Sequence, residues 1–243
     1  MSQIRRHHVW DATTRWFHWI NVFCVAGLAA IGIVIMNAGG LDISNAGKVT
    51  LKTAHVWIGY VFSLNLLWRL IWAFIGGPHA RWRAILPGGR GYGRALSEYL
   101  GAFFSGRPVT YLGHNPAGRL AVSLLLLLLV VQALTGLFLA GTDLFYPPIG
   151  PWIAQWVAAP GTNPADLLPY APQMYAPEAY EAMRAWRAPI IELHEINFFI
   201  LGAMIVLHIA AVVITEIRER SGLISAMFSG EKIIEGTAAD EVD

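Results

Sequence analysis

The chain has 243 residues, of which 56% are hydrophobic and 14% charged, and its mean hydropathy is +0.50. Soluble domains carry about 25% charged residues, so this composition predicts a protein that lies in lipid. The net charge of +1 gives no electrostatic support for nucleic-acid binding. The single cysteine, Cys24, excludes an intrachain disulfide and an iron–sulfur cluster held by the chain's own cysteines.

Four segments are long and apolar enough to cross a bilayer, which takes roughly 20 mostly apolar residues. Backbone polar groups in hydrocarbon must bond within their own segment, so each span is predicted to be a helix. In chain order the predicted spans are 16–36, 53–75, 118–140 and 189–215. The first is too long for the core of a signal peptide and is predicted to be uncleaved. Pro189 stands at the expected start of the fourth span, where a missing N–H costs least.

The predicted fold is all-α, an integral membrane four-helix bundle that forms a single domain over residues 1–243. With four spans, the N-terminus, the loop 76–117 and the tail 216–243 share one side of the membrane. That side carries 11 of the 17 Lys and Arg residues, whereas the connections on the other side carry 4. The positive-inside rule therefore places both termini in the cytoplasm and the loop 141–188 in the periplasm.

The two long connections differ in character. In the cytoplasmic loop, segment 92–104 alternates apolar and charged positions with helical spacing, which predicts an amphipathic helix at the membrane interface. The periplasmic loop 141–188 contains too many prolines for a regular span. Loops of this length are usually functional or disordered.

Four of the eight histidines fall within predicted spans: His18, His55, His194 and His208. Ionisable groups inside a membrane are costly and mostly functional. A hydrogen bond to a neighbouring helix would explain a single histidine there equally well, but it does not explain four. The other histidines lie outside the spans and are expected on the solvated surface: His7, His8, His79 and His114.

The spacing of the intramembrane histidines predicts two paired sites. His194 and His208 are 14 residues apart, which puts both rings on nearly the same helix face at a separation of about 21 Å. That separation excludes one shared metal ion. Matching depths across the spans pairs His55 with His194 near the outer surface and His18 with His208 near the inner surface. Facing imidazoles from two helices form a bis-histidine site for haem iron, so an outer and an inner haem are predicted.

Residues beside these ligands suit a haem pocket. Gly59 lies one turn beyond the outer ligand on its own helix, where a small residue lets a flat macrocycle approach the backbone. Arg15 and Lys52 each lie three residues before a predicted ligand, so they are candidates to pair a haem propionate, although a snorkelling interfacial charge explains them equally well. Asn21 is another candidate polar partner of the inner haem. The remaining glycines of the spans are expected to pack helices: Gly27, Gly32, Gly136 and Gly202.

Short motifs are spread over nearly the whole chain. They are His7-His8-Val9-Trp10-Asp11 with Arg15-Trp16-Phe17-His18-Trp19, Lys52-x-x-His55-x-x-x-Gly59-Tyr60, Arg69-x-x-Trp72-x-Phe74-x-Gly76, Gly113-His114-Asn115-Pro116, Thr135-Gly136, and Ile224-Ser225-Ala226-Met227-Phe228-Ser229-Gly230. Together with the two histidines of the fourth span, they make the chain resemble the superfamily of bacterial cytochrome b561 and the b-type cytochrome of nickel–iron hydrogenase. The family's four haem ligands fall on the four histidines that depth matching selects.

The resemblance implies two haem b groups in a protein of the bacterial cytoplasmic membrane. It also implies a quinone or quinol on one side of the membrane and a redox partner on the other. In hydrogenases this partner is the periplasmic enzyme. The long loop 141–188 departs from the hydrogenase pattern, which favours a role in capping the outer haem or docking a periplasmic c-type cytochrome.

The function predicted from the sequence is transmembrane electron transfer between the quinone pool and a periplasmic c-type cytochrome or hydrogenase-like enzyme. No catalytic residue is assigned, and whether the chain is an enzyme by itself stays open. One alternative is a stand-alone quinone-linked oxidoreductase acting on a small periplasmic substrate such as superoxide. Another is a histidine-lined proton or metal transporter without haem. Membrane lipid is an expected partner, and a homodimer is compatible with the sequence.

Overall fold

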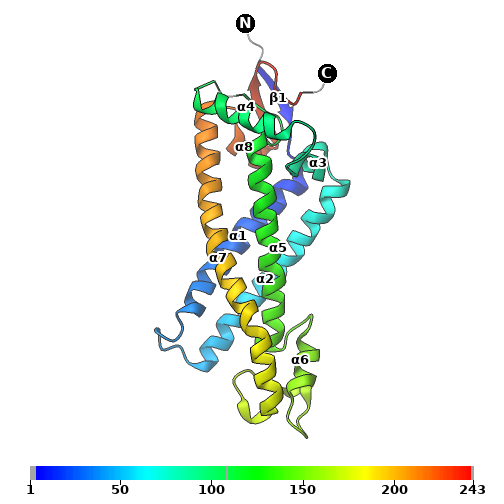
Figure 1. Cartoon of the computed structure of the whole chain (residues 1–243), viewed down its shortest axis with the longest axis vertical. Helices are drawn as coiled ribbons and strands as arrows, with labels where there is room; N and C mark the ends of the chain where they lie inside the picture. Colours follow the sequence, from blue (N-terminus) through cyan, green and yellow to red (C-terminus); the bar gives the residue numbers. More distant parts are fainter. Residues whose placement is uncertain (1–3, 108, 242–243) are drawn as a thin grey trace. The chain divides into compact units, whose positions relative to one another are not determined.

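The computed structural model describes residues 4–107 and 109–241. Among these residues, four helices are long and apolar enough to cross a membrane. Figure 1 shows them as the long coiled ribbons: α1 (Ala12–Met36), α2 (Asn45–Ile75), α5 (Pro116–Leu144) and α7 (Pro177–Glu219). The predicted all-α membrane fold is therefore confirmed, and each predicted span lies within one of these helices.

Shorter elements connect the long helices. They are β1 (Ile4–His8), η1 (Pro78–Ala80), α3 (Trp82–Ile85), α4 (Tyr92–Phe104), α6 (Gly150–Val157), η2 (Pro164–Asp166), η3 (Pro172–Met174), α8 (Leu223–Ser229) and β2 (Glu231–Glu235). Helix α4 has the bounds expected for the amphipathic helix of the loop 76–117. Its position at a membrane surface stays a prediction.

Helix α7 begins earlier than the sequence predicts. It runs for 43 residues from Pro177, and Pro189 lies inside it. The preceding segment 178–188 is rich in Glu, Ala and Arg, which are strong helix formers. Pro177 takes the first helical position, where the missing N–H costs least. The expected start at Pro189 is therefore wrong, and the connection between α5 and α7 shortens to residues 145–176.

By the contacts within the chain, the protein divides into two compact units. Unit 1 comprises Met1–Ile20, Asn65–Leu128 and Leu201–Asp243. Unit 2 comprises Asn21–Leu64 and Leu129–Ile200. Each long helix contributes one segment to each unit, so each unit contains parts of all four.

In unit 1 the two ends of the chain meet in a small sheet that the sequence did not predict. Strands β1 and β2 pair antiparallel, with His8 opposite Glu231, and Figure 1 shows them side by side. Beside the sheet, Val9 and Trp10 pack on Ala226 of α8 in a buried apolar cluster. The C-terminal segment is therefore part of the fold of unit 1.

In unit 2 the segment 145–176 has a small core of its own. Ile153 and Val157 of α6 are buried against Tyr175 and against Met183 of α7. Backbone bonds hold the segment in place, since the N–H of Ala176 donates to the carbonyl of Val157 at 2.8 Å. The proline-rich connection is thus an ordered element packed on the first turns of α7.

Asp11 joins the start of α1 to α2 within unit 1. Its Oδ1 accepts the backbone N–H of Thr14 at 2.7 Å and caps α1, while its Oδ2 accepts the indole N–H of Trp72 at 3.0 Å. Burial alone would raise the pKa of this carboxyl. The hydrogen bonds from Thr14 and Trp72 outweigh burial, so the pKa of Asp11 is lowered from its ordinary value of 3.8.

We expect Asp11→Ala to lower the free energy of unfolding by about 2–3 kcal/mol, because it removes a helix cap and a hydrogen bond to a charged acceptor. Asp11→Asn keeps one carbonyl oxygen, which can still cap Thr14, but loses the second acceptor that Trp72 needs, so it should cost roughly half as much. Unfolding in detergent, followed by tryptophan fluorescence, measures both losses. Equal losses for the two variants would show that the capping oxygen contributes nothing.

The same carboxyl predicts a pH dependence. Because the folded-state pKa of Asp11 is depressed, its stabilisation is fully present above the unfolded pKa and is lost as pH falls through the folded pKa. The stability difference between the wild type and Asp11→Asn should therefore be constant above about pH 5 and shrink below about pH 4. A difference that persists unchanged at pH 2 would contradict this assignment.

Candidate functional site

Unit 2 contains one of the two predicted histidine pairs. His55 lies on α2 and His194 on α7, and both are half-buried. Both belong to unit 2, and the ring of His194 lies within electrostatic range of that of His55. The structure thus brings together the residues predicted for the outer site, while iron binding by them stays a prediction.

A glycine on a neighbouring helix backs each of these rings. A Cβ added to Gly32 of α1 would lie 3.5 Å from Cε1 of His55, and one added to Gly136 of α5 would lie 3.3 Å from Cε1 of His194. The contact at Gly136 is tighter than ordinary packing, so a side chain there would displace the ring of His194 slightly, whereas a Cβ at Gly32 would touch the ring of His55 at normal packing distance. From the sequence both glycines are expected only to pack helices, so this contact was not predicted. At Gly59 an added Cβ would meet no described atom within 4 Å, so its role as a pocket wall stays a prediction.

His194 is bonded at both ring nitrogens. Thr135 Oγ1 lies 2.8 Å from Nδ1, and Gln132 Nε2 lies 3.0 Å from Nε2. Asn197 in turn donates its side-chain N–H to Gln132 Oε1 at 2.6 Å. From the sequence, Thr135 is noted only as part of a family motif and no role is assigned to Gln132 or Asn197, although each lies in a long apolar helix, where the reasoning used for the histidines applies equally.

An ion-pair cluster joins three helices of unit 2. Lys52 of α2 lies 2.5 Å from Asp143 of α5, and Arg187 of α7 pairs with the same carboxylate. The ammonium of Lys52 also lies 5.4 Å from the ring centre of Tyr170. Lys52 therefore has a protein counter-ion, which the sequence did not predict. Two cations on one anion leave one positive charge, and this charge suits an anionic group such as a propionate.

Unit 1 contains the second predicted pair, His18 on α1 and His208 on α7, which also interact electrostatically. Trp19 stands edge-on to the ring of His18, with ring centres 5.2 Å apart, and donates its indole N–H to the carbonyl of Met227 at 3.0 Å. Nδ1 of His18 is buried, and in the described part of the chain it has no hydrogen-bond partner. The same holds for Nδ1 of His55.

The two predicted polar partners of the inner site have different surroundings. The guanidinium of Arg15 donates to the carbonyl of Phe228, and its Nε is buried without a partner among the described residues. Asn21 belongs to unit 2, and its side-chain oxygen is likewise buried without a described partner. Contact of either residue with a haem stays a prediction.

The residues present fit a haem in each unit. Two imidazoles from different helices are the donors that bis-histidine haem iron takes, and unit 2 adds glycines beside the rings and a net positive cluster. The amide of Gln132 contacts Nε2 of His194 and so occupies the position that iron would take at this nitrogen. Rotation of this flexible side chain clears the nitrogen, so the contact does not exclude iron.

The prediction that all four remaining histidines are solvated is wrong. Only His8 is exposed, and Nδ1 of His114 is buried without a described partner. The ring of His114 lies 4.9 Å from that of Trp10. Burial, with the nearby charge of Lys232, lowers the pKa of His114 to about 3, which keeps its ring neutral near pH 7.

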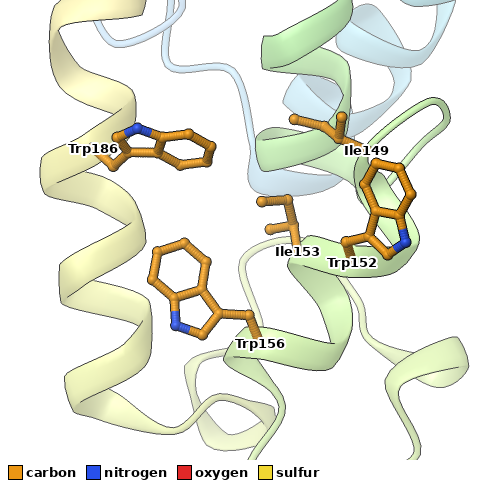
Figure 2. A pocket seen from close by; sticks show the side chains of 5 residues that line it. All are labelled: Ile149, Trp152, Ile153, Trp156 and Trp186. Carbon is orange, nitrogen blue, oxygen red and sulfur yellow. The ribbon is translucent and has the colours of Figure 1, made fainter.

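An aromatic groove of about 630 Å³ lies between α6 and α7 of unit 2, apart from the residues of the paired site. It is lined by Ile149, Trp152, Ile153, Trp156 and Trp186. Figure 2 shows Trp186 pointing from α7 towards α6. The lining contains no charged side chain, and tryptophans at this density are typical of the membrane–water interface.

Comparison with known proteins agrees with the resemblance noted in the sequence. The family described as prokaryotic cytochrome b561 matches residues 9–230. A probable Ni/Fe-hydrogenase B-type cytochrome subunit of Cupriavidus necator is 25% identical, over 94% of this chain and 88% of the relative. The corresponding protein of Rhizobium leguminosarum bv. viciae is 28% identical, over 93% of this chain and 88% of the relative. The hydrogenase 1 subunit of Escherichia coli K12 is 26% identical, over 92% of this chain and 89% of the relative. No solved structure matches the chain.

We expect Asp143→Asn to destabilise the protein by about 2–4 kcal/mol, because it leaves two poorly solvated cations without a counter-ion. Lys52→Met should cost only about 1 kcal/mol, since the pair of Arg187 with Asp143 remains. Unfolding in detergent compares the two variants at equal salt. A larger loss for Lys52→Met than for Asp143→Asn would contradict the central role of the carboxylate.

Proposed function

The chain belongs to the prokaryotic cytochrome b561 family, whose members are membrane-bound b-type cytochromes, and we propose that it transfers electrons across the bacterial cytoplasmic membrane through two haem b groups. The observation that carries the proposal is the arrangement of four intramembrane histidines as two pairs. One pair lies in each compact unit, and in both pairs the rings come from different helices.

In this proposal His18 and His208 are the axial ligands of one haem, and His55 and His194 those of the other. When bound, each haem supplies a one-electron couple at its iron. The protein holds the ligands on four different segments of its long helices, and in unit 2 it places glycines beside the two rings. It also provides positive charge for the propionates, from the cluster of Lys52 and Arg187 with Asp143 in unit 2 and from Arg15 in unit 1.

The distribution of basic residues supports a topology with both termini in the cytoplasm. In that topology the site of His55 and His194 lies near the periplasm, and the site of His18 and His208 lies near the cytoplasm. His194 and His208 are about 21 Å apart along one helix, so electrons pass between sites at different depths.

We assign the quinone pool as one redox partner and a periplasmic protein as the other. Several relatives carry the name of hydrogenase b-type cytochrome subunit, and these names favour a hydrogenase-like enzyme over a c-type cytochrome as the periplasmic partner. The ordered segment 145–176 follows α5 on the periplasmic side of this topology and is the surface we assign to that contact.

Replacing His208 with Ala should remove one haem of two, because the iron loses one of its axial ligands. His18→Ala should remove the same haem, whereas His55→Ala and His194→Ala should each remove the other. A pyridine haemochrome assay gives the haem count, and optical redox titration identifies the haem that remains. His8→Ala, at an exposed histidine, is the control and should keep both. Retention of both haems in His208→Ala would refute the proposed ligands.

Electron transfer is tested in membrane vesicles with a quinol as donor. We expect the wild type to show quinol-dependent reduction of both haems, and reduction of the remaining haem alone in His194→Ala. Reoxidation by the periplasmic partner should be lost in that variant. Sustained turnover of the wild type with quinone and superoxide, in the absence of any partner protein, would instead support a stand-alone oxidoreductase. Transport in vesicles by a chain that lacks visible haem absorption would support a transporter.

A further inference from the structure

The ring of His194 is the best-anchored imidazole of the two predicted sites. It contacts Thr135 through Nδ1 and Gln132 through Nε2, at 2.8 Å and 3.0 Å. Both partners lie on α5, about one turn apart, whereas the histidine lies on α7. Neutral imidazole has one N–H and one lone pair on its two nitrogens, so partners at both ends determine its tautomer.

Thr135 determines the tautomer from the Nδ1 end. A threonine hydroxyl has a single proton, and here it points to carbonyls of its own helix, at 2.7 Å from the oxygen of Val131 and 3.2 Å from that of Gln132. The hydroxyl oxygen is then left as an acceptor for His194. Nδ1 must therefore carry the ring's proton.

Gln132 leads to the same tautomer from the other end. Asn197 donates to Gln132 Oε1 at 2.6 Å, so the amide carbonyl is engaged and the amide NH₂ faces the histidine. An NH₂ group only donates, and Nε2 must supply the lone pair that it needs. The opposite tautomer would set one donor against another at 3.0 Å and leave Nδ1 without a proton for Thr135.

We propose that Thr135 is a positioning residue that holds His194 in the Nδ1-protonated tautomer and so presents the Nε2 lone pair to iron once the Gln132 side chain rotates away. This inference rests on the proposed function, in which His194 is an axial ligand. A ligating histidine that donates its other N–H to a fixed acceptor becomes a more basic ligand. A more basic ligand stabilises ferric over ferrous iron, so Thr135 lowers the midpoint potential of the haem that His194 binds.

The effect is confined to one site. In the described part of the chain, Nδ1 of His18 and Nδ1 of His55 are buried without any hydrogen-bond acceptor. Thr135 belongs to unit 2, together with His55 and His194. The haem of His18 and His208 in unit 1 therefore serves as an internal control in the same molecule.

The test is Thr135→Val in the full-length, haem-loaded protein, with Thr135→Ser as the matched control. Valine keeps the shape of threonine but removes the acceptor, whereas serine keeps the hydroxyl. We expect the midpoint potential of one haem to rise in Thr135→Val, with a change in the low-spin electron paramagnetic resonance signal of that haem alone. Thr135→Ser should match the wild type in both measurements.

Loss of one haem in Thr135→Val alone, with the other haem at its wild-type potential, would also support the inference, because the histidine would then have lost its orientation while the fold survived. Unchanged potentials and spectra of both haems would overturn it. An equal change in both haems would overturn it too, since that result indicates a general packing effect. A wild-type protein without bis-histidine haem would overturn the proposed function itself, and this is seen before any variant is made.

Discussion

A helix in hydrocarbon bonds its backbone to itself, so polar contacts between membrane helices are made mainly by side chains. An unpaired polar group there costs several kcal/mol, and each polar side chain in a span therefore favours one arrangement of its neighbours. Asn65 of α2 meets this demand by donating to the carbonyl of Phe17 in α1 at 3.0 Å. Lys52 and Asp143 meet it between α2 and α5. These few bonds favour the helix neighbours seen within each unit.

The same constraint explains why glycines lie beside the rings of unit 2. An imidazole that points between helices has to fit into the narrow space between two backbones. Gly32 and Gly136 supply that space, each on the long helix that precedes the ligand's helix in the chain. In unit 1 the described aromatic neighbour of His18 is Trp19 of its own helix, which stands edge-on to the ring. The two sites are thus built from the same ligands but different neighbours, which is a physical basis for unequal haem potentials.

Much of the fold was predictable because hydropathy and length dominate the free energy of a membrane helix. The spans and the amphipathic helix 92–104 follow from that pattern. The start of α7 does not follow from hydropathy, because residues 178–188 are strong helix formers but too polar to be counted as part of a span. Strands β1 and β2 were also beyond prediction, since they form only when the two ends of the chain meet.

The candidate site shows the same division. The histidines were found because an ionisable side chain in an apolar segment is rare, and Gln132 and Asn197, which lie in the predicted spans, were open to the same reasoning. Gly32 and Gly136 were not, because small residues are common in membrane helices and only the structure distinguishes those that touch a ring. The partners of Lys52 likewise depend on which helices are neighbours, which sequence spacing alone does not specify.

Two physical classes can be distinguished among the motifs that make this chain resemble its family. One contains the histidines of the spans. The other ties the chain's ends together, because Gly230, with φ of 87°, accepts the N–H groups of Val9 and Trp10 through its carbonyl. Lys232 is buried and donates to the carbonyls of Tyr111 and Gly113.

His114 belongs to this second class. A charged imidazole beside Lys232 would add an uncompensated cation to a buried site, and burial together with that lysine lowers its pKa to about 3. A proton carrier needs a pKa near the working pH, so this histidine is unsuited to shuttle protons near pH 7. The packing of His114 against Trp10 is enough to explain its presence in the motif. A family motif is therefore evidence of redox chemistry only where the structure brings the motif's residues close to the paired imidazoles.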